Sequence, residues 1–361
     1  MARAKPVPED WPEAGVTMPM EAALADALPS GPDWQFEPKW DGFRCLAFRN
    51  GGAVELRAKS GKPLGRYFPE VVQRLEALAE KAFVLDGELV IARGGAVDFD
   101  ALQLRLHPAE SRVRKLARET PAELVVFDML AHAEGSLIDT PLAERREALE
   151  RFVAGLGDAS GLRLSPCTLD RAKAEAWLAG TGDALDGVIA KDRTAPYRAG
   201  ERAMIKVKRL RTADCVVGGF RYAHGKKEVG SLLLGLYDDA GLLDHVGFTS
   251  SFGSEDRAAL TRKLEKLVEE PGFTGKAPGG PSRWNSGRNS AFEPLKPELV
   301  VEVRYDHVTG ARFRHGTKFL RWRPDKAPGQ CRFGQLAPPA NPEHLEQLLR
   351  RAERADNSIS A

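Results

Sequence analysis

One short stretch combines residue types that could carry out covalent phosphate chemistry: residues 37–44, Glu-Pro-Lys-Trp-Asp-Gly-Phe-Arg. The amine of Lys39 can act as a covalent nucleophile when a dry site or neighbouring cations suppress its charge. Asp41-Gly42 is a turn signal, which predicts that Lys39 stands at a strand end or in a loop. Arg44 can offer a planar fork of donors to a phosphate or a ribose. Alone, the stretch also fits an ordinary exposed lysine beside a turn, so its interpretation depends on the other motifs of the chain.

Two further stretches place polar or aromatic side chains in apolar strands. Residues 83–91, Phe-Val-Leu-Asp-Gly-Glu-Leu-Val-Ile, predict a buried strand that carries Asp86 and Glu88. Apolar strands rarely carry two acids without a partner, so we favour a metal or ribose contact for Glu88 over a solvated hairpin. Residues 123–130 predict another buried strand, in which Phe127 is either a core residue or a stacking face for a base.

A last pair of motifs adds positive charge. Asp186-Gly187 is another Asp-Gly step beside apolar residues, and residues 203–209 alternate apolar with basic side chains. Strand alternation places Lys206 and Lys208 on the same face. Two ammonium groups pointing one way repel each other unless an anion lies between them, and a phosphate is the natural guest. The alternative is a solvated strand face.

Composition limits the class of protein. A chain of 361 residues predicts two or three domains, and a net charge of +2 confines any nucleic-acid surface to a local patch. The four cysteines lie far apart without a CxxC pair, which indicates neither a zinc site nor a disulfide framework and fits a reducing cytoplasm. The first residues lack the apolar region of a secretion signal, and no apolar run approaches the length of a membrane span.

The first half of the chain reads as a mixture of helices and strands. After a lead-in with a helix near residues 20–28, we expect a hairpin of strands at 44–49 and 54–57, further strands at 83–91, 123–130, 162–166 and 203–209, and helices at 69–81, 98–118, 141–153 and 169–179. This half therefore predicts an α+β domain.

Composition changes after residue 211. Short strands at 215–220, 231–237, 243–248, 299–305 and 312–319, with a helix at 254–269, predict a small Greek-key barrel of the OB type. Cations interleaved with aromatic side chains near its end suit a nucleic-acid backbone; the cations are Arg304, Arg312, Arg314, Lys318, Arg321, Arg323 and Lys326. We predict a first domain over 1–208, a hinge at 209–212, the barrel over 213–340, and a C-terminal helix and tail at 341–361.

Taken in order, the motifs resemble those of the ATP-dependent DNA ligases. The resemblance spans roughly residues 30–340 and rests on six signatures: Lys39-Trp-Asp-Gly-Phe-Arg44, Asp86-Gly-Glu88, Phe127-Asp128, Asp186-Gly-Val-Ile-Ala-Lys191, Lys206-Val-Lys208 and Arg323-Pro-Asp325-Lys326. Length and plan are similar to the short stand-alone bacterial ligases of the ligase C type and to the ligase module of ligase D. The resemblance implies an α+β fold, a covalent nucleotidyltransferase (adenylation) domain followed by a C-terminal OB-fold β-barrel.

The resemblance also implies a mechanism. Lys39 would attack the α-phosphate of ATP, AMP would pass to the 5′-phosphate of a DNA nick, and the 3′-hydroxyl would expel AMP. These steps are phosphoryl transfers, in which a protein mainly positions groups and neutralises charge.

The family assigns roles to the matching residues. Lys206 and Lys208 would contact the α-phosphate, and Arg44 and Lys59 would bind phosphate or ribose, including the nick 5′-phosphate. The remaining assignments are Glu88 and Asp186 for ribose and Mg²⁺ or Mn²⁺, Glu37 for the adenine amino group, Phe127 and Ile189 for the two faces of the ring, Arg323, Asp325 and Lys326 for the ATP pyrophosphate, and Arg304, Arg312, Arg314 and Lys318 for DNA.

Three positions depart from the family pattern. Asp186 stands where glutamate is usual, which shortens the reach to a metal by one methylene. Met204 stands where a tryptophan is common, and Lys59 stands where arginine is frequent, which loses a bidentate contact. None of these changes removes a charge, so activity is still expected.

The motifs also leave other functions open. An RNA ligase or an mRNA-capping guanylyltransferase shares the nucleophile motif, and a non-catalytic protein that binds DNA ends could retain a decayed pocket. We expect a cytoplasmic, monomeric enzyme that acts on nicked duplex DNA in repair, with Ku or a repair polymerase as candidate partners.

Overall fold

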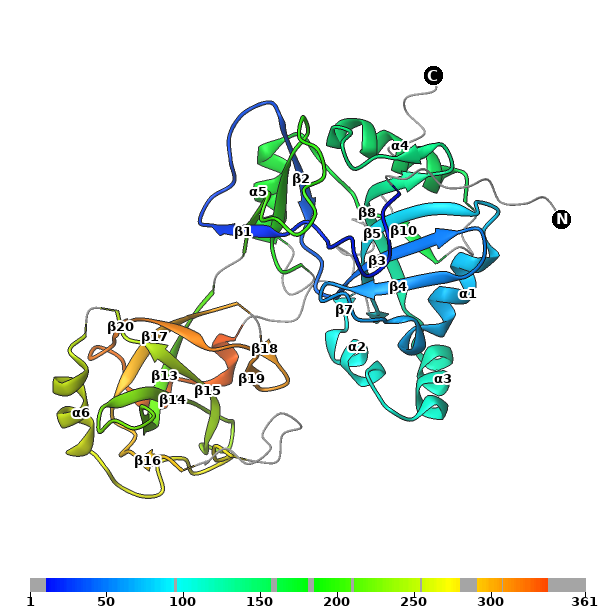
Figure 1. Cartoon of the computed structure of the whole chain (residues 1–361). Helices are drawn as coiled ribbons and strands as arrows, with labels where there is room; N and C mark the ends of the chain where they lie inside the picture. Colours follow the sequence, from blue (N-terminus) through cyan, green and yellow to red (C-terminus); the bar gives the residue numbers. More distant parts are fainter. Residues whose placement is uncertain are drawn as a thin grey trace. The chain divides into compact units, whose positions relative to one another are not determined.

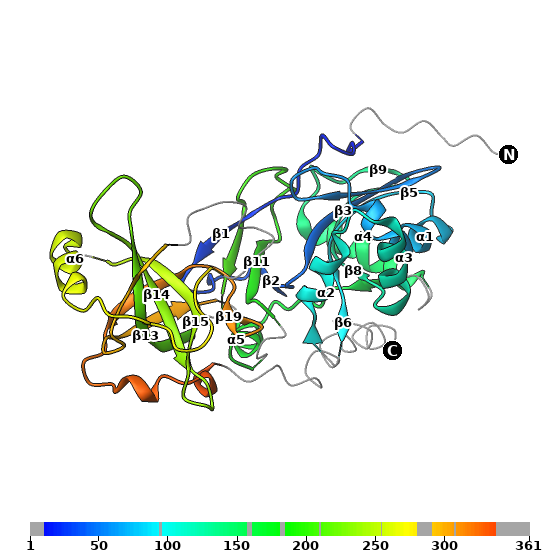
Figure 2. The ribbon, with the colours of Figure 1, turned by 90° about the horizontal axis from the view of Figure 1, so that it is seen from below.

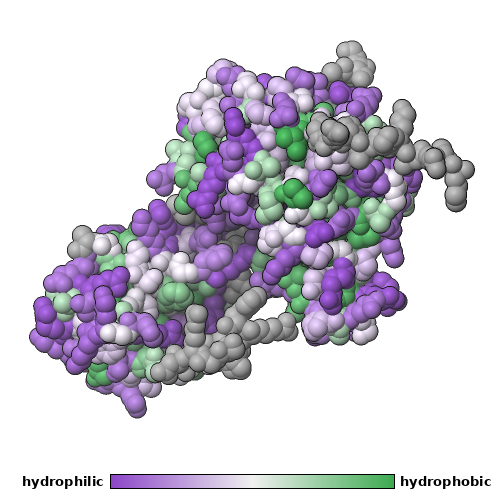
Figure 3. All heavy atoms as spheres, viewed as in Figure 1, coloured by the Kyte–Doolittle hydropathy of each residue, from purple (hydrophilic) through white to green (hydrophobic). Residues whose placement is uncertain are grey.

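The computed structural model describes residues 11–93, 96–156, 161–180, 185–208, 211–253, 255–279, 291–306 and 308–336. These residues form two compact units that divide after Lys208 (Figure 1). Within these ranges no helix is long and apolar enough to cross a membrane. Figure 3 shows a mainly hydrophilic face with small, scattered apolar patches.

The first unit contains a mixed sheet that carries the Asp86 and Phe127 motifs. Its strand order is β10-β8-β5-β3-β4, and β9 pairs with β8. The strands are β3 (Phe43–Asn50), β4 (Val54–Ala58), β5 (Ala82–Val90), β8 (Glu123–His132), β9 (Gly135–Ser136) and β10 (Leu162–Leu164). All pairs are antiparallel except β10 with β8. A small hairpin, β6 (Ala92–Arg93) and β7 (Ala96–Val97), follows β5.

Strand alternation divides the side chains of this sheet between two cores. On β3, Cys45 and Ala47 join a core that includes residues of the helices, whereas Leu46 and Phe48 join a core with residues of the second sheet. The helices are α1 (Pro69–Ala77), α2 (Phe99–Arg105), α3 (Glu110–Glu119) and α4 (Leu142–Ala154), with a 3₁₀ turn η1 (Gly65–Tyr67) before α1 (Figures 1 and 2). The sheet therefore has a helical side and a side that faces another sheet.

The second sheet brings together segments from both ends of the unit. Its order is β1-β12-β11-β2, formed by β1 (Ala22–Ala25), β2 (Trp34–Pro38), β11 (Val188–Asp192) and β12 (Met204–Val207). Helix α5 (Arg171–Gly180) contributes Ala174 to a core shared with Phe36 and Val188 of this sheet. The predicted α+β domain is thus two packed sheets with outer helices, and the backbone that carries Lys39, Asp186 and Lys208 lies at the ends of strands of the second sheet.

The predicted helix near residues 20–28 is wrong. Residues Ala22–Ala25 form β1 and pair in parallel with β12, Leu24 opposite Lys206. Alanine favours helix, but Pro19 and Pro29 leave a segment too short to be stable as an isolated helix. An available sheet edge supplies hydrogen bonds that the short helix could not match.

Two other predicted elements are each split in two. The helix predicted over 98–118 is α2 and α3, with Pro108 between them, because proline interrupts the helical hydrogen bonds. The strand predicted over 312–319 is β19 (Arg312–Phe313) and the start of β20 (Thr317–Trp322). The other predicted helices and strands are present, with ends that differ by a few residues.

The second unit is a closed barrel. Its strands are β13 (Arg211–Tyr222), β14 (Val229–Tyr237), β15 (Leu243–Ser251), β17 (Val300–Tyr305) and β20, in the order β14-β15-β20-β17-β13, and a β13–β14 pairing closes the ring. β15 and β20 run parallel, and α6 (Arg257–Glu265) lies between β15 and β17 in sequence. Short elements complete it: β16 (Glu293–Pro294), β18 (Val308–Thr309), η3 (Pro328–Gln330) and η4 (Phe333–Gln335). This Greek-key barrel confirms the predicted OB fold.

The predicted hinge and tail fall at the edges of the described residues. Residues 211–212 are the first residues of β13 and pair with Tyr305 and Arg304. Residues 209–210 and the helix and tail predicted at 341–361 lie outside the described part of the chain.

A buried ion pair joins α4 to β8 in the first unit. Arg145 donates from Nε and Nη2 to the two carboxylate oxygens of Asp128 at 2.8 and 2.9 Å, and both side chains are buried. Burial opposes the charge on Asp128, but Arg145 outweighs burial and lowers the pKa of that carboxyl. The pair therefore holds α4 against the sheet through matched charges.

We expect Arg145→Met to destabilise the first unit by about 3–5 kcal/mol, because Asp128 would stay buried without its partner. Urea denaturation measures this loss of stability, and hydrogen exchange of the β8 amides shows whether it falls on the first unit. The double variant Asp128→Asn/Arg145→Met carries no charge at this place and should recover part of it. Equal stability of wild type and Arg145→Met would contradict the expectation.

Candidate active site

A cavity of about 220 Å³ gathers most of the site residues that were predicted in the first unit. Its lining includes Glu37, Lys39, Arg44, Lys59, Glu88, Phe127, Ile189 and Lys206. They come from motifs that are far apart in the sequence and from strands of both sheets. The cavity therefore has a cationic part around the lysines and an apolar part around Phe127 and Ile189.

Lys39 lies against a carboxylate that it shares with a second lysine. Its Nζ is 2.5 Å from Oδ2 of Asp186, and Nζ of Lys208 is 3.3 Å from the same oxygen. The backbone fixes this contact, because the Lys39 amide donates to the Gly187 carbonyl and the Asp186 amide donates to the Lys39 carbonyl, both at 2.9 Å. Gly187 has φ of +143°, and a Cβ there would lie 2.2 Å from the Val207 carbonyl oxygen. Glycine is therefore required where Asp186 meets the two lysines.

Positive charge is concentrated around this carboxylate. Burial lowers the pKa of Lys206, and the charges of Lys39, Lys208 and Lys59 lower it further. Lys59 in turn lies 3.1 Å from a carboxylate oxygen of Glu21. Such a cluster favours the binding of an anion, which would relieve the mutual repulsion of the ammonium groups.

Arg44 and Glu88 lie on the neighbouring strands β3 and β5, directly opposite each other. Arg44 makes a bidentate ion pair with Asp86, Nε–Oδ1 2.6 Å and Nη2–Oδ2 2.7 Å. Glu88 accepts a hydrogen bond from the Gly42 amide at 3.2 Å. Burial raises the pKa of Glu88 to about 7, against the opposing charges of Arg44 and Lys39. Glu88 is thus a carboxyl whose charge is costly until a cation reaches it.

A buried carboxylate, that of Glu37, lines the cavity beside its apolar part. Ile189 stands opposite Glu37 in the β11–β2 pairing. Both oxygens of the buried Glu37 carboxylate have partners, Gln35 Nε2 and Lys191 Nζ, each at 2.8 Å. The ring of Phe127 has the Lys191 ammonium 4.5 Å and the Arg44 guanidinium 4.6 Å from its centroid. A flat aromatic ligand would meet apolar surface here, with a fixed carboxylate at its rim.

The barrel cations belong to the second unit. Arg323 donates to both carboxylate oxygens of Asp325 and to Asp214, and Lys326 Nζ lies 3.2 Å from Asp214. Among the cations predicted to bind DNA, Arg304 on β17 lies opposite Lys318 on β20 in the strand register, so these two residues are neighbours. Arg312 donates from Nη2 to Nδ1 of His245 at 2.9 Å, and Arg314 lies close by in sequence.

Sequence reasoning missed the residues that precede and support the motifs. Residues 19–22 line the cavity, although the segment carries no chemical signal beyond Glu21. Lys191 was visible within the fourth signature, but its contact with Glu37 was not. Tyr197 was missed completely; its hydroxyl contacts Asp86 at 2.6 Å.

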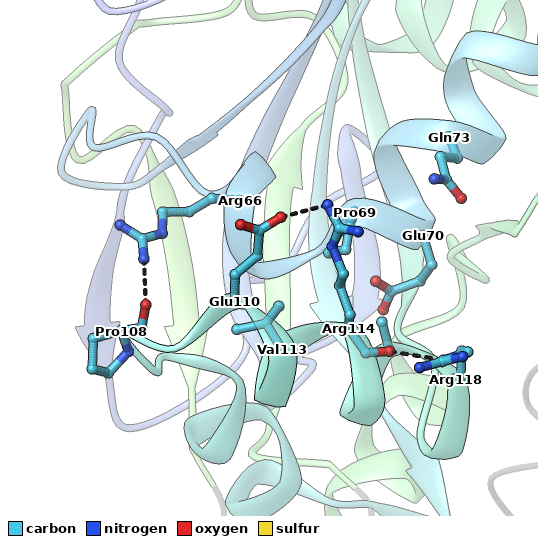
Figure 4. A pocket seen from close by; sticks show the side chains of 10 residues that line it. Arg66, Pro69, Glu70, Gln73, Pro108, Glu110, Val113, Arg114 and Arg118 are labelled. Carbon is cyan, nitrogen blue, oxygen red and sulfur yellow. Dashed lines mark hydrogen bonds and ion pairs between the residues drawn. The ribbon is translucent and has the colours of Figure 1, made fainter.

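A larger cavity, about 660 Å³, lies between α1 and α3 and contains none of the predicted residues. Figure 4 shows Arg66, Glu70, Glu110, Arg114 and Arg118 among its side chains. Glu110 and Arg114 form an exposed ion pair there, which contributes little binding energy. The smaller cavity, where the motifs converge, is therefore the candidate active site.

The described residues contain no group of three or more His, Cys, Asp or Glu side chains that could hold a metal by themselves. Mg²⁺ commonly uses one or two carboxylates and completes its octahedron with phosphate oxygens and water. Glu88 and Asp186 could supply these carboxylates: Asp186 contacts Lys39, and Glu88 is near enough to feel the charge of Lys39. A divalent cation would therefore need the nucleotide as a further ligand.

A lysine in a pocket lined from two packed sheets, followed by an OB barrel, agrees with the plan of the covalent nucleotidyltransferases that the motifs resemble. Residues 19–208 match the family model of the ATP dependent DNA ligase domain, and residues 225–326 match that of the ATP dependent DNA ligase C terminal region. The chain belongs to the family of ATP-dependent DNA ligases.

Individual relatives agree with this assignment. The chain is 45% identical to DNA ligase C of Mycobacterium tuberculosis over 337 residues, covering 89% of this chain and 94% of that protein. It is 46% identical to DNA ligase C1 of Mycolicibacterium smegmatis, covering 90% and 96%. A solved Lig E DNA ligase, 18% identical, shares the fold with a TM-score of 0.52 over 84% of this chain and 99% of that chain.

We expect the raised pKa of Glu88 to make stability depend on pH. Between the ordinary glutamate pKa of about 4.5 and about 7, the unfolded chain loses the proton that folded Glu88 keeps. Wild type should therefore lose stability relative to Glu88→Gln as pH rises through this window. Unfolding midpoints of both proteins between pH 4.5 and 8, without nucleotide or metal, measure the difference. A difference that is constant with pH would contradict the shift.

Proposed function

We propose that this ligase seals 5′-phosphate/3′-hydroxyl nicks in duplex DNA through a covalent AMP intermediate on Lys39. The observation that carries the proposal is the position of Lys39: it lines the cavity with Lys206 and Phe127, and it contacts Asp186, which also contacts Lys208. Nζ of Lys39, deprotonated to the amine, attacks the α-phosphorus of ATP: a P–N bond forms, the bond from this phosphorus to the pyrophosphate oxygen breaks, pyrophosphate leaves, and the nitrogen releases its proton to water. Lys206 and Lys208 neutralise the charge on the transferring phosphoryl group.

The later steps use the same surroundings. An oxygen of the nick 5′-phosphate attacks the AMP phosphorus and breaks the P–N bond, and Arg44 and Lys59 hold this 5′-phosphate. The 3′-hydroxyl then attacks the 5′-phosphorus, and AMP leaves. Phe127 and Ile189 enclose the adenine ring, and Glu37 accepts from its amino group. Mg²⁺ or Mn²⁺, bound by Glu88 and Asp186 with phosphate oxygens, would neutralise charge on the phosphates.

The cellular setting is also a proposal. A relative that is 31% identical over 82% of this chain is a multifunctional non-homologous end joining protein, LigD, of Mycobacterium bovis, and this chain spans 37% of its length. We propose that this ligase acts in DNA repair in the cytoplasm, as a monomer, and that Ku or a repair polymerase is a candidate partner.

The first test is labelling of the protein. Mixed with α-³²P ATP and Mg²⁺ or Mn²⁺, wild type should retain label after denaturation, and GTP or NAD⁺ should give none. Lys39→Ala should abolish both labelling and nick sealing, because the nucleophile is gone, and should leave salt-sensitive DNA binding intact. The control variant is Lys115→Ala, because Lys115 is exposed and lies outside the cavity. Lys191→Ala would not serve, because Lys191 lines the same cavity.

Three outcomes would contradict the proposal. Sealing by Lys39→Ala would exclude the covalent mechanism, and better sealing of single-stranded RNA than of nicked DNA would favour an RNA ligase. If wild type takes no label, the protein is first treated with pyrophosphate, which removes any AMP already bound, and the labelling is repeated. If the treated wild type still took no label, a non-catalytic DNA-binding function would be favoured.

The barrel residues are expected to divide between two tasks, one in the reaction with ATP and one in DNA binding. We propose that Arg323, Asp325 and Lys326 orient the pyrophosphate of ATP, and that Arg304, Arg312, Arg314 and Lys318 bind the DNA backbone. Arg323→Ala should lower the rate of Lys39 adenylation at least about tenfold, since it removes a charge-assisted contact, but should spare sealing of a nick that already carries AMP. Rapid-quench assays of the two steps measure this. Equal loss in both steps would count against the assignment.

A further inference from the structure

The hydroxyl of Tyr197 connects three segments around the cavity. It donates to Oδ2 of Asp86 at 2.6 Å and accepts from the Met20 amide at 2.8 Å. Tyr197 is 3% exposed and lies in the connection between β11 and β12, whereas Asp86 is on β5 and Met20 precedes β1. One hydroxyl thus ties a central strand to a segment that lines the cavity.

The same three residues determine where Arg44 can point. Arg44 uses Nε and Nη2 on Asp86, and Nη2 also donates to the Met20 carbonyl at 3.2 Å. Within the described part of the chain, Nη1 of Arg44 has no hydrogen-bond partner, and the side chain is 20% exposed and lines the cavity. The network therefore holds one side of the guanidinium and leaves the other side for a ligand.

The ring of Tyr197 is held independently of its hydroxyl. The Arg145 guanidinium lies 5.6 Å from the ring centroid, and the Tyr197 amide donates to the Ile138 carbonyl at 2.8 Å. Burial, with the nearby Asp86 charge, raises the pKa of Tyr197 well above its ordinary value, so the hydroxyl keeps its proton and remains a donor to Asp86. Removal of the hydroxyl alone should therefore leave the ring in place and release Asp86 and Met20.

We propose that Tyr197 is a positioning residue for recognition of the nick 5′-phosphate. Through Asp86 it fixes the guanidinium of Arg44 so that Nη1 faces the phosphate, and through Met20 it holds the wall of the cavity next to Arg44. This inference rests on the proposed contact between Arg44 and the nick 5′-phosphate.

The test compares Tyr197→Phe with wild type in separate steps. Lys39 adenylation is measured with labelled ATP, and transfer of AMP to nicked DNA is measured with pre-adenylated protein. We expect transfer at low DNA concentration to fall about tenfold, the cost of one hydrogen bond to a charged group, mainly as a higher KM for DNA. Adenylation should stay within about twofold of wild type. The matched control is Tyr67→Phe, which removes a tyrosine hydroxyl from η1 of the same unit and should change neither step.

A double-mutant cycle distinguishes positioning from general support of the fold. If Tyr197 acts through Arg44, then Tyr197→Phe should change transfer less than about twofold in an Arg44→Ala background. The same tenfold loss in that background would overturn the proposal, as would wild-type transfer by Tyr197→Phe itself. Unfolding midpoints are recorded for each variant, and the cycle remains decisive if Tyr197→Phe is less stable, because lost stability would act in both backgrounds. Absence of labelling in wild type would instead contradict the proposed function, which keeps the two failures distinct.

Discussion

The shared carboxylate of Asp186 is the contact on which the site depends. Lys39 and Lys208 place ammonium groups at 2.5 and 3.3 Å from the same oxygen, and Lys206 lies near enough for their charges to lower its pKa. Without an anion among them these cations would repel one another and spread into solvent. The paired backbone hydrogen bonds between Lys39 and the Asp186-Gly187 turn fix the carboxylate there. Backbone geometry thus positions Lys39, the proposed nucleophile, and the carboxylate that balances its charge is a group that a phosphate could replace.

Buried ion pairs fix the remaining walls of the cavity. Arg44 is locked by Asp86, and Glu37 by Lys191, and the cations of both pairs lie near the ring of Phe127. Such pairs contribute less to stability than apolar packing of the same volume, because both charges lose their hydration. Their benefit is orientation: each pair restricts a polar group that would otherwise sample several rotamers. A nucleotide pocket needs such restriction more than it needs additional stability.

The sequence predicted the chemistry of this site better than its support. Glu88 was found because an acid stood in an apolar strand, Lys206 because basic residues alternated with apolar ones, and Lys39 and Phe127 through the motifs around them; the structure brings all four into one cavity. The barrel was predicted because strand and turn signals are local. Partners that depend on tertiary packing could not be predicted, since nothing in the sequence near Tyr197 indicates that it meets Asp86.

The false helix at residues 20–28 has the same origin. Alanine-rich composition reports local preference, whereas β1 forms because β12 offers an edge. Three kinds of assignment stay predictions: the roles of individual residues, the metal ligands and the hinge. They concern bound states and movement between units, which the motifs imply only by resemblance.

The cations of this ligase share one arrangement in both units. Lys39 and Lys208 contact Asp186, Lys59 contacts Glu21, and, in the barrel, Arg323 and Lys326 contact Asp214. If these cations bind phosphate as proposed, an arriving phosphate would exchange with a protein carboxylate and would not meet a bare charge. The net gain is then the difference between two similar interactions, which keeps binding moderate while leaving each cation in place. An enzyme that binds ATP, releases pyrophosphate, accepts the 5′-phosphate of a nick and releases AMP would benefit from such an exchange, because no single intermediate would be held too tightly to leave.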